Sequence, residues 1–238
     1  MRHGKDRLMN REDIRYRHEL KHEINYMDML TIRQRLRAFA SFDPHAPDGH
    51  YHIRSLYFDN LSDKALKEKI DGVNCREKFR IRYYNDDTSY INLEKKSKLN
   101  SLGTKYSARL SAEQSQAIVD GDTDWMKDSF DPLIIELYLK MTYQGLKPKT
   151  IVDYEREPYI FGPGNVRVTF DSHIRTSMYA KDFLPGEVRD ISATDTPQDM
   201  ILEVKYDAFM PEIIRELIRT GNIRQQAFSK YGACRRYG

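Results

Sequence analysis

Arg76-Glu-Lys-Phe-Arg-Ile-Arg-Tyr-Tyr84 is the stretch of sequence from which the fold is inferred. Successive side chains of a β-strand point to opposite faces, so one face carries Arg76, Lys78, Arg80 and Arg82. The apolar and aromatic residues between them form the other face. Four neighbouring cations repel one another unless an anion lies between them. A charged edge strand that prevents sheet aggregation would show the same pattern, so the choice depends on whether other strands repeat it.

The composition indicates one folded domain and no general attraction for nucleic acid. The chain has 238 residues, 39% hydrophobic and 32% charged, which is typical of a globular protein. The net charge is only +3, so any preference for anions must come from how the charges are arranged. No segment has the pattern of a membrane span or a signal peptide, and Cys75 and Cys234 lack metal-ligand spacing. We expect a cytoplasmic protein with a polar lead-in at 1–14 and one domain at 15–238.

Other predicted strands repeat the charged face. Strands are predicted at 15–24, 53–60, 76–84, 90–98, 104–110, 150–159, 165–175 and 200–207. Helices are predicted at 28–42, with Asp28 as N-cap, and at 62–70, 111–120, 132–143 and 211–220. The segment 178–197 is expected to be irregular. At least six strands have one charged or polar face, and the helices can cover the apolar faces. The pattern therefore predicts an α+β fold, a closed barrel with a polar interior that holds anions and with helices packed outside.

A Glu-x-Lys pattern occurs on three of these strands, as Glu19/Lys21, Glu94/Lys96 and Glu203/Lys205. Ion pairing between strands would explain any single case. Three cases on converging faces favour a carboxylate site for Mg²⁺ or Mn²⁺ beside bound phosphates. Simple charge balance remains the alternative.

Seven fragments, in order along the chain, carry a family resemblance. They are 16–21, 54–59, 76–82, 93–98, 154–159, 201–206 and 228–231. Together they resemble the VTC domain, the polyphosphate polymerase module of the vacuolar transporter chaperone complex, within the triphosphate tunnel metalloenzymes. The resemblance spans 15–236. It implies an eight-stranded antiparallel tunnel in which the γ-phosphate of ATP is transferred to a growing polyphosphate chain.

The resemblance also implies roles for individual residues. It implies catalytic roles for four residues, Arg80, Arg82, Arg167 and Lys230. It implies phosphate binding by seven more, Lys21, Lys78, Lys96, Lys105, Tyr154, Arg156 and Lys205. Glu203 corresponds to the principal metal ligand, with Glu19 as a helper, and the implied cofactor is Mn²⁺ or Mg²⁺. The implied partners are ATP and inorganic polyphosphate.

One departure from the family pattern bears on the reaction. The wider superfamily begins with Glu-x-Glu-x-Lys, whereas Arg17 takes the place of the first glutamate here. This favours a polymerase, and we expect a free-standing bacterial form without a membrane segment. A metal-dependent triphosphatase or nucleoside triphosphatase remains an alternative, as does a non-catalytic receptor for polyphosphate or inositol phosphate. Nucleic acid is disfavoured because Phe79 and Tyr83 lie opposite the cations. Nucleotide preference, product length and oligomeric state stay open.

Overall fold

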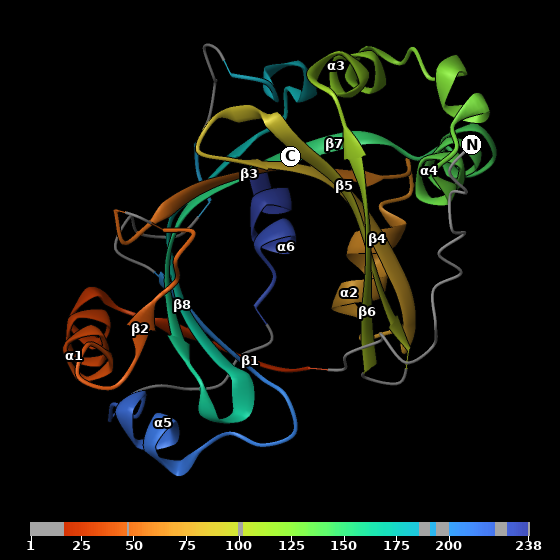
Figure 1. Ribbon diagram of the computed structural model, residues 1–238. Coiled ribbons are helices and arrows are strands. Elements are labelled where there is room, and N and C mark those ends of the chain that lie inside the picture. The colour runs from red at the N-terminus through yellow and green to blue at the C-terminus, as the bar shows by residue number, and fades with distance from the viewer. Residues whose placement is uncertain are drawn as a thin grey trace, which may run out of the picture.

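The computed structural model describes residues 17–46, 48–99, 102–185, 191–193, 200–221 and 228–237. They form one antiparallel sheet with the order β1-β10-β8-β7-β3-β4-β5-β6, to which β2 and β9 are paired (Figure 1). The strands are β1 (His18–Ile24), β2 (Ser41–Phe42), β3 (Tyr51–Asp59), β4 (Cys75–Tyr84), β5 (Asp87–Leu99), β6 (Leu102–Leu110), β7 (Lys147–Phe161), β8 (Val166–Ser177), β9 (Ile191–Ser192) and β10 (Met200–Tyr206). The helices are α1 (Tyr26–Leu36), α2 (Lys64–Ile70), α3 (Ala112–Asp120), α4 (Pro132–Gln144), α5 (Glu212–Leu217) and α6 (Lys230–Cys234), with 3-10 turns η2 (Asp124–Asp128), η3 (Pro163–Asn165), η4 (Ala180–Asp182) and η5 (Arg235–Tyr237).

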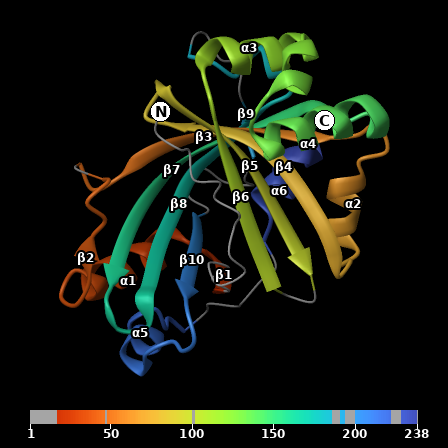
Figure 2. The same ribbon diagram turned by 45° about the vertical axis from the view of Figure 1, so that its right-hand side comes forward.

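The sheet curls, and helices cover its convex side (Figure 2). Under α3, α4 and η2, the core contains Phe79, Ile81 and Leu93 from the strands. Under α1 and α5, a second core contains Val168 and Leu202. Because side chains alternate along each strand, burying these residues turns the intervening charged residues toward the concave side. The prediction that helices pack on the outside of an α+β fold is therefore confirmed for these helices.

The predicted closed barrel is wrong for the part of the chain that the structure describes. There, β1 pairs with β10 and β6 pairs with β5, and the two end strands are not paired with each other. The eight-stranded antiparallel path is present, but it forms a curled open sheet. Cations on the two sides of the curl repel each other, since Lys205 of β10 helps to lower the pKa of Lys96 of β5. This repulsion opposes closure.

A short helix inside the curl was not predicted. Figure 1 places α6 on the concave side of the sheet, where Tyr231 and Cys234 pack with Tyr57, Val152 and Tyr154. The interior therefore contains an apolar cluster around these two side chains of α6 in addition to its charged groups. The five-residue length of α6 leaves no periodic signal from which the sequence could predict it.

Several boundaries differ from the prediction for local reasons. Helix α1 begins at Tyr26 because Asn25 accepts a hydrogen bond from the Asp28 backbone, so Asp28 is not the cap. It ends at Leu36, and Ser41–Phe42 pair with β7. The predicted irregular segment contains η4 and β9, and residues 1–14 lie outside the described part. No helix in the described residues is long and apolar enough to cross a membrane.

Candidate functional site

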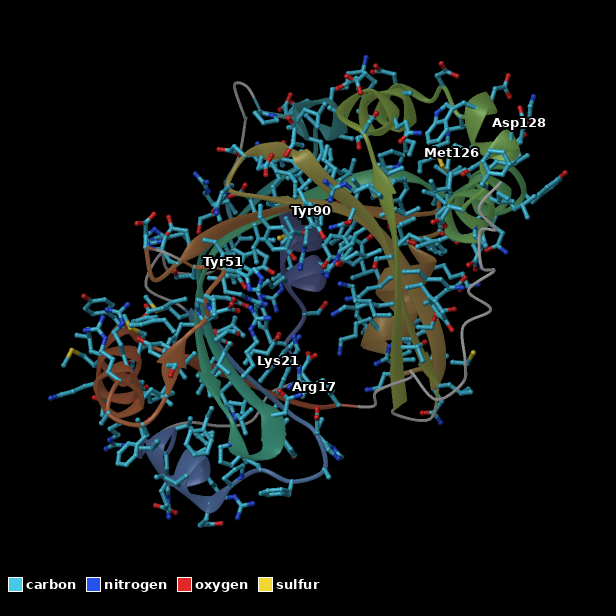
Figure 3. The ribbon with its side chains drawn as sticks, viewed as in Figure 1. Arg17, Lys21, Tyr51, Tyr90, Met126 and Asp128 are labelled. Atoms are coloured by element: carbon cyan, nitrogen blue, oxygen red, sulfur yellow. The ribbon has the colours of Figure 1, made fainter. Side chains whose placement is uncertain are left out.

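Two groups of charged side chains face each other across the concave side. The carboxylate wall consists of six residues on β1, β10, β8 and β7, namely Glu19, Lys21, Arg156, Asp171, Glu203 and Lys205. The lysine wall consists of six residues on β4, β5 and β6, namely Lys78, Arg80, Arg82, Glu94, Lys96 and Lys105. Figure 3 shows Lys21 inside the curl and Met126 outside it. The two walls thus contain all but three of the predicted site residues. The remaining three, Arg167, Tyr154 and Lys230, contact residues of the walls or lie next to them.

In the carboxylate wall, the first and last Glu-x-Lys motifs are paired crosswise. The register places Lys21 opposite Glu203 and Glu19 opposite Lys205. The Lys21 ammonium lies 2.7 Å from Glu19 Oε1 and 3.5 Å from Glu203 Oε2, and Lys205 contacts Glu203. Burial raises the pKa of Glu19, but Lys21 and Lys205 outweigh it and lower this pKa to about 2. The same lysines lower the pKa of Glu203 despite its burial, so both carboxylates are ionised at neutral pH.

These two carboxylates fit a divalent cation that takes its other ligands from elsewhere. Their oxygens are the hard donors that Mg²⁺ and Mn²⁺ prefer. Within the described ranges, no group of three or more Asp, Glu, His or Cys side chains could hold a metal ion. Arg17 adds no ligand and instead pairs with Asp207 at 2.9 Å. Mg²⁺ typically uses one or two carboxylates together with phosphates and water, so Glu19 and Glu203 suit an ion carried by a phosphate substrate.

Asp171 is the anchor that sequence reasoning missed. It is fully buried and accepts hydrogen bonds from Arg156 Nε and Nη2 at 2.6 and 2.7 Å. Lys230 reaches Asp171 from α6, and its ammonium lies 4.8 Å from the centre of the Tyr154 ring. Arg156 Nη2 is 3.8 Å from Glu203 Oε1. The available signal was the position of Asp171 on the polar face of its predicted strand.

The arginines of the lysine wall are held in fixed orientations. Glu94, 2% exposed, accepts a hydrogen bond from Arg80 Nε at 2.7 Å and also pairs with Lys105. Arg82 donates to Ser55 Oγ at 2.8 Å and to the Tyr154 hydroxyl at 3.2 Å. These bonds leave other guanidinium N–H groups for a ligand, and they limit the entropy lost when one binds.

Two lysines of this wall form no ion pair with a carboxylate in the described part of the chain. Lys78 lies opposite Lys96, and Lys96 lies opposite Lys105. Of the carboxylates in the described residues, none forms an ion pair with Lys78 or Lys96. Burial, Arg80 and Lys205 lower the pKa of Lys96 well below its ordinary value, and burial and Arg80 lower that of Lys78. An anion between the walls would relieve this repulsion.

Arg167 lies opposite Lys205 in the sheet, but different groups hold it. Its Nη2 donates to Asp43 Oδ2 at 2.7 Å and to the Tyr51 hydroxyl at 2.6 Å. One third of its side chain is exposed. Arg167 is thus placed next to the carboxylate wall and tied to the loop before β3, rather than in the centre of the site.

A cavity of about 470 Å³ lies elsewhere, on the convex side, and none of its lining residues belongs to the two walls. It is lined by charges of both signs, Asp48, Arg54, Asp86, Glu155 and Arg175, together with His50, His52 and Asn85. The buried carboxylate of Asp153 lies beneath it and accepts hydrogen bonds from Arg54 at 2.8 Å and from Arg175 at 2.8 Å. Both guanidinium groups therefore share one carboxylate as their hydrogen-bond partner.

Comparisons with known proteins agree with this architecture. The family model of the VTC domain matches residues 16–237, and no curated protein matches the chain. A solved structure from Hippeastrum, HpAC1, described as an adenylyl cyclase with a dominant triphosphatase activity, aligns with a TM-score of 0.51 at 12% identity over 93% of this chain and 96% of that chain. The PH1012 protein of Pyrococcus horikoshii OT3 aligns at 15% identity over 85% of both chains, with a TM-score of 0.43. At these identities the Hippeastrum likeness supports the fold alone.

Proposed function

The chain belongs to the VTC domain family, and from that premise we propose that it is a phosphotransferase that moves the γ-phosphate of ATP onto a growing polyphosphate chain. The observation that carries the proposal is a pair of lysines, Lys78 and Lys96, that form no ion pair with a carboxylate of the described residues and that face ionised carboxylates across the concave side. Cations that are partly buried and uncompensated are costly to the fold, so a polyanionic substrate is the simplest reason for them.

Phosphoryl transfer asks the protein mainly to position phosphates and to stabilise developing charge. In the proposed reaction, a terminal oxygen of the acceptor chain bonds to the γ-phosphorus, the bond to the β–γ bridging oxygen breaks, and ADP leaves. Arg80, Arg82 and Arg156 orient the phosphate oxygens, because Glu94, Ser55 and Asp171 already fix their guanidinium groups. Lys78 and Lys96 neutralise the added charge. The acceptor is itself an ionised phosphate, so no general base is needed.

Glu203 and Glu19 are the residues that would hold Mn²⁺ or Mg²⁺ in this site. Such an ion would supply positive charge that offsets the negative charge of the phosphates. In the ligand-free chain, Lys21 and Lys205 pair with these carboxylates. With the ion bound, the same two lysines would be available to contact the substrate. Lys230 keeps Asp171 neutralised, so that Arg156 retains its orientation.

The proposal is tested by incubating the purified protein with ATP and Mn²⁺, sizing any polyphosphate on a gel and measuring ADP and free phosphate in the same samples. A polymerase produces long chains, with one ADP released for each phosphate incorporated. Release of free phosphate without chains would overturn the polymerase proposal.

That second outcome defines the main alternative. With water as the acceptor, the same cations would support hydrolysis of triphosphate or of a nucleoside triphosphate, the activity named for the Hippeastrum protein. Binding of polyphosphate without any turnover would instead identify a receptor. The buried Glu203 argues against a receptor, because a buried carboxylate among the cations weakens anion binding unless it holds a metal ion.

A further inference from the structure

Tyr57 has an unusual position among the cations of the lysine wall. It lies on β3, is 5% exposed, and stacks on Tyr231 of α6 with ring centroids 5.0 Å apart. Arg80 Nη1 donates to its hydroxyl oxygen at 2.8 Å, and the Lys78 ammonium lies 5.5 Å from its ring centre. In the described part of the chain, no acceptor forms a hydrogen bond with the proton of this hydroxyl. The Tyr57 oxygen therefore only accepts, which is the arrangement that favours a phenolate.

Two other buried tyrosines show the opposite arrangement. Tyr231 donates to Asp59 Oδ2 at 2.7 Å, and burial and Asp59 raise its pKa. Tyr83 donates to the Phe183 carbonyl at 2.6 Å, and burial raises its pKa. Burial also raises the pKa of Tyr57, but Arg80, Lys78 and Arg82 outweigh it and lower the pKa to about 7. Burial is common to all three tyrosines, so the difference in their pKa values comes from their hydrogen-bond partners and from the neighbouring charges.

The neighbouring elements supply Tyr57 with a surplus of positive charge. Three cations of β4 act on its hydroxyl, namely Lys78, Arg80 and Arg82. Tyr154 of β7 and Tyr231 of α6 pack in the same cluster. The nearest carboxylates act through other residues, since Glu94 of β5 pairs with Arg80 and Asp59 of β3 accepts a hydrogen bond from Tyr231. Glu94 is already shared by Arg80 and Lys105. Asp59 is occupied by Tyr231 and by the backbone at the start of α2. No carboxylate named here is left to compensate Lys78.

We propose that Tyr57 is a proton-exchanging counter-ion of the phosphate site: its phenolate balances Arg80 and Lys78 while no phosphate chain is bound, and it takes up a proton from solvent when phosphate oxygens replace it. The inference rests on the proposed function only in requiring that a phosphate chain binds between the walls. The O–H bond formed with the proton from solvent is the one covalent change in this step. Because binding takes up a proton, raising the pH above the midpoint of Tyr57 weakens phosphate binding.

The test uses the near-ultraviolet absorbance of tyrosinate, since inorganic tripolyphosphate is transparent there. A pH titration of the ligand-free full chain should show one tyrosine ionising near neutrality, far below the ordinary tyrosine pKa of about 10. Saturation with tripolyphosphate slightly above neutral pH should remove that tyrosinate signal. Tyr57→Phe should lack both changes, while Tyr231→Phe, which removes the neighbouring hydroxyl, should retain both. Loss of both changes in Tyr231→Phe would overturn the assignment to Tyr57.

Calorimetric titration with tripolyphosphate separates the two proposals. Lys78, Lys96 and the ligand itself also exchange protons, so the quantity of interest is the ratio of the wild-type Kd to the Tyr57→Phe Kd. From about pH 6 to about pH 8 this ratio should rise by up to roughly tenfold. Binding with an unchanged ratio and no tyrosinate signal would overturn the Tyr57 proposal alone. A tyrosinate signal in the free protein without any binding would overturn the proposed function and the proton uptake.

Discussion

Replacing Lys96 by methionine should stabilise the ligand-free protein and weaken its binding of phosphate chains. Lys96 is partly buried, faces Lys78 and Lys105 in the sheet, and is not ion-paired with any carboxylate of the described residues. Methionine keeps the length of the side chain and removes the charge. Replacing buried charges by apolar groups of similar size stabilises some proteins by roughly 1–4 kcal/mol. Because Lys96 is only partly buried, we expect about 1 kcal/mol, or a rise of roughly 2–4 °C in Tm for a chain of this size.

The position that makes Lys96 costly in the ligand-free fold also makes it favourable for binding phosphate, so Lys96→Met should weaken binding. A hydrogen bond to a charged group contributes about 1.5–3 kcal/mol, which corresponds to a roughly tenfold to hundredfold weaker Kd for tripolyphosphate. Thermal unfolding without ligand gives the first quantity, and calorimetric titration gives the second. The stability gain should also shrink as pH rises. Folding lowers the pKa of Lys96, so the unfolded chain binds more protons, and wild-type stability increases toward the ordinary lysine pKa of 10.5.

Lys95→Met is the matched control, one residue away on the other face of the same strand. Lys95 lies 3.2 Å from Glu77 Oε2 and also pairs with Glu136, and these carboxylates raise its pKa despite burial. Its replacement should cost about 1 kcal/mol of stability and leave tripolyphosphate binding unchanged. A lower Tm for Lys96→Met, or unchanged binding by that variant, would refute the interpretation of Lys96 as an uncompensated phosphate ligand.

Four further substitutions test other parts of the structure. Glu203→Gln should abolish metal-dependent ADP release from ATP with the far-ultraviolet circular dichroism spectrum unchanged; turnover at the wild-type rate would exclude Glu203 as a metal ligand. His52 and Arg54 outweigh the burial of Asp153 and lower its pKa from 3.8 to about 2. Its ionised form therefore contributes about 2 kcal/mol to the free energy of unfolding above pH 3.8, and this contribution is lost as the pH falls toward 2. Urea unfolding should show that Asp153→Asn is less stable than the wild type at neutral pH and lacks this acid-dependent loss, whereas equal pH dependence would contradict the assignment. Asp171→Asn should destabilise the fold by about 3–5 kcal/mol. In a double-mutant cycle measured by urea unfolding, the variant with both Asp171→Asn and Lys230→Met should lose less stability than the sum of the two single losses. Strictly additive losses would argue against coupling between the two residues.

The inner faces of the strands could be predicted from the sequence because alternation along a strand is a local property. Arg80 and Arg82 share the face of Lys78 whatever the rest of the chain does, and the apolar residues between them must be buried. The same logic assigned Glu203 and Lys205 to one face of β10. The two-residue alternation of side chains along each strand therefore identified the residues that line the concave side, without any knowledge of how the strands pair.

Which cation pairs with which carboxylate could not be predicted, because it depends on register and on α6. Lys21 meets Glu203 only because β1 pairs antiparallel with β10 in one particular alignment. Asp171 becomes an anchor only when Arg156 from β7 and Lys230 from α6 reach it. Each contact joins segments far apart in the sequence, and shifting a strand by one residue would reverse the faces it presents.

The ion pairs divide the cations of the site into two kinds that cannot be distinguished by residue type. Arg80 and Arg156 are paired with the buried carboxylates Glu94 and Asp171, so their main contribution is a fixed geometry, and removing either anion would leave an uncompensated charge. Lys78 and Lys96 contribute attraction without a carboxylate partner among the described residues, at a cost to the ligand-free fold. Substitutions in the first group should therefore lower stability and binding together. Substitutions in the second group should change them in opposite directions, which a site built only for structural charge balance would not do.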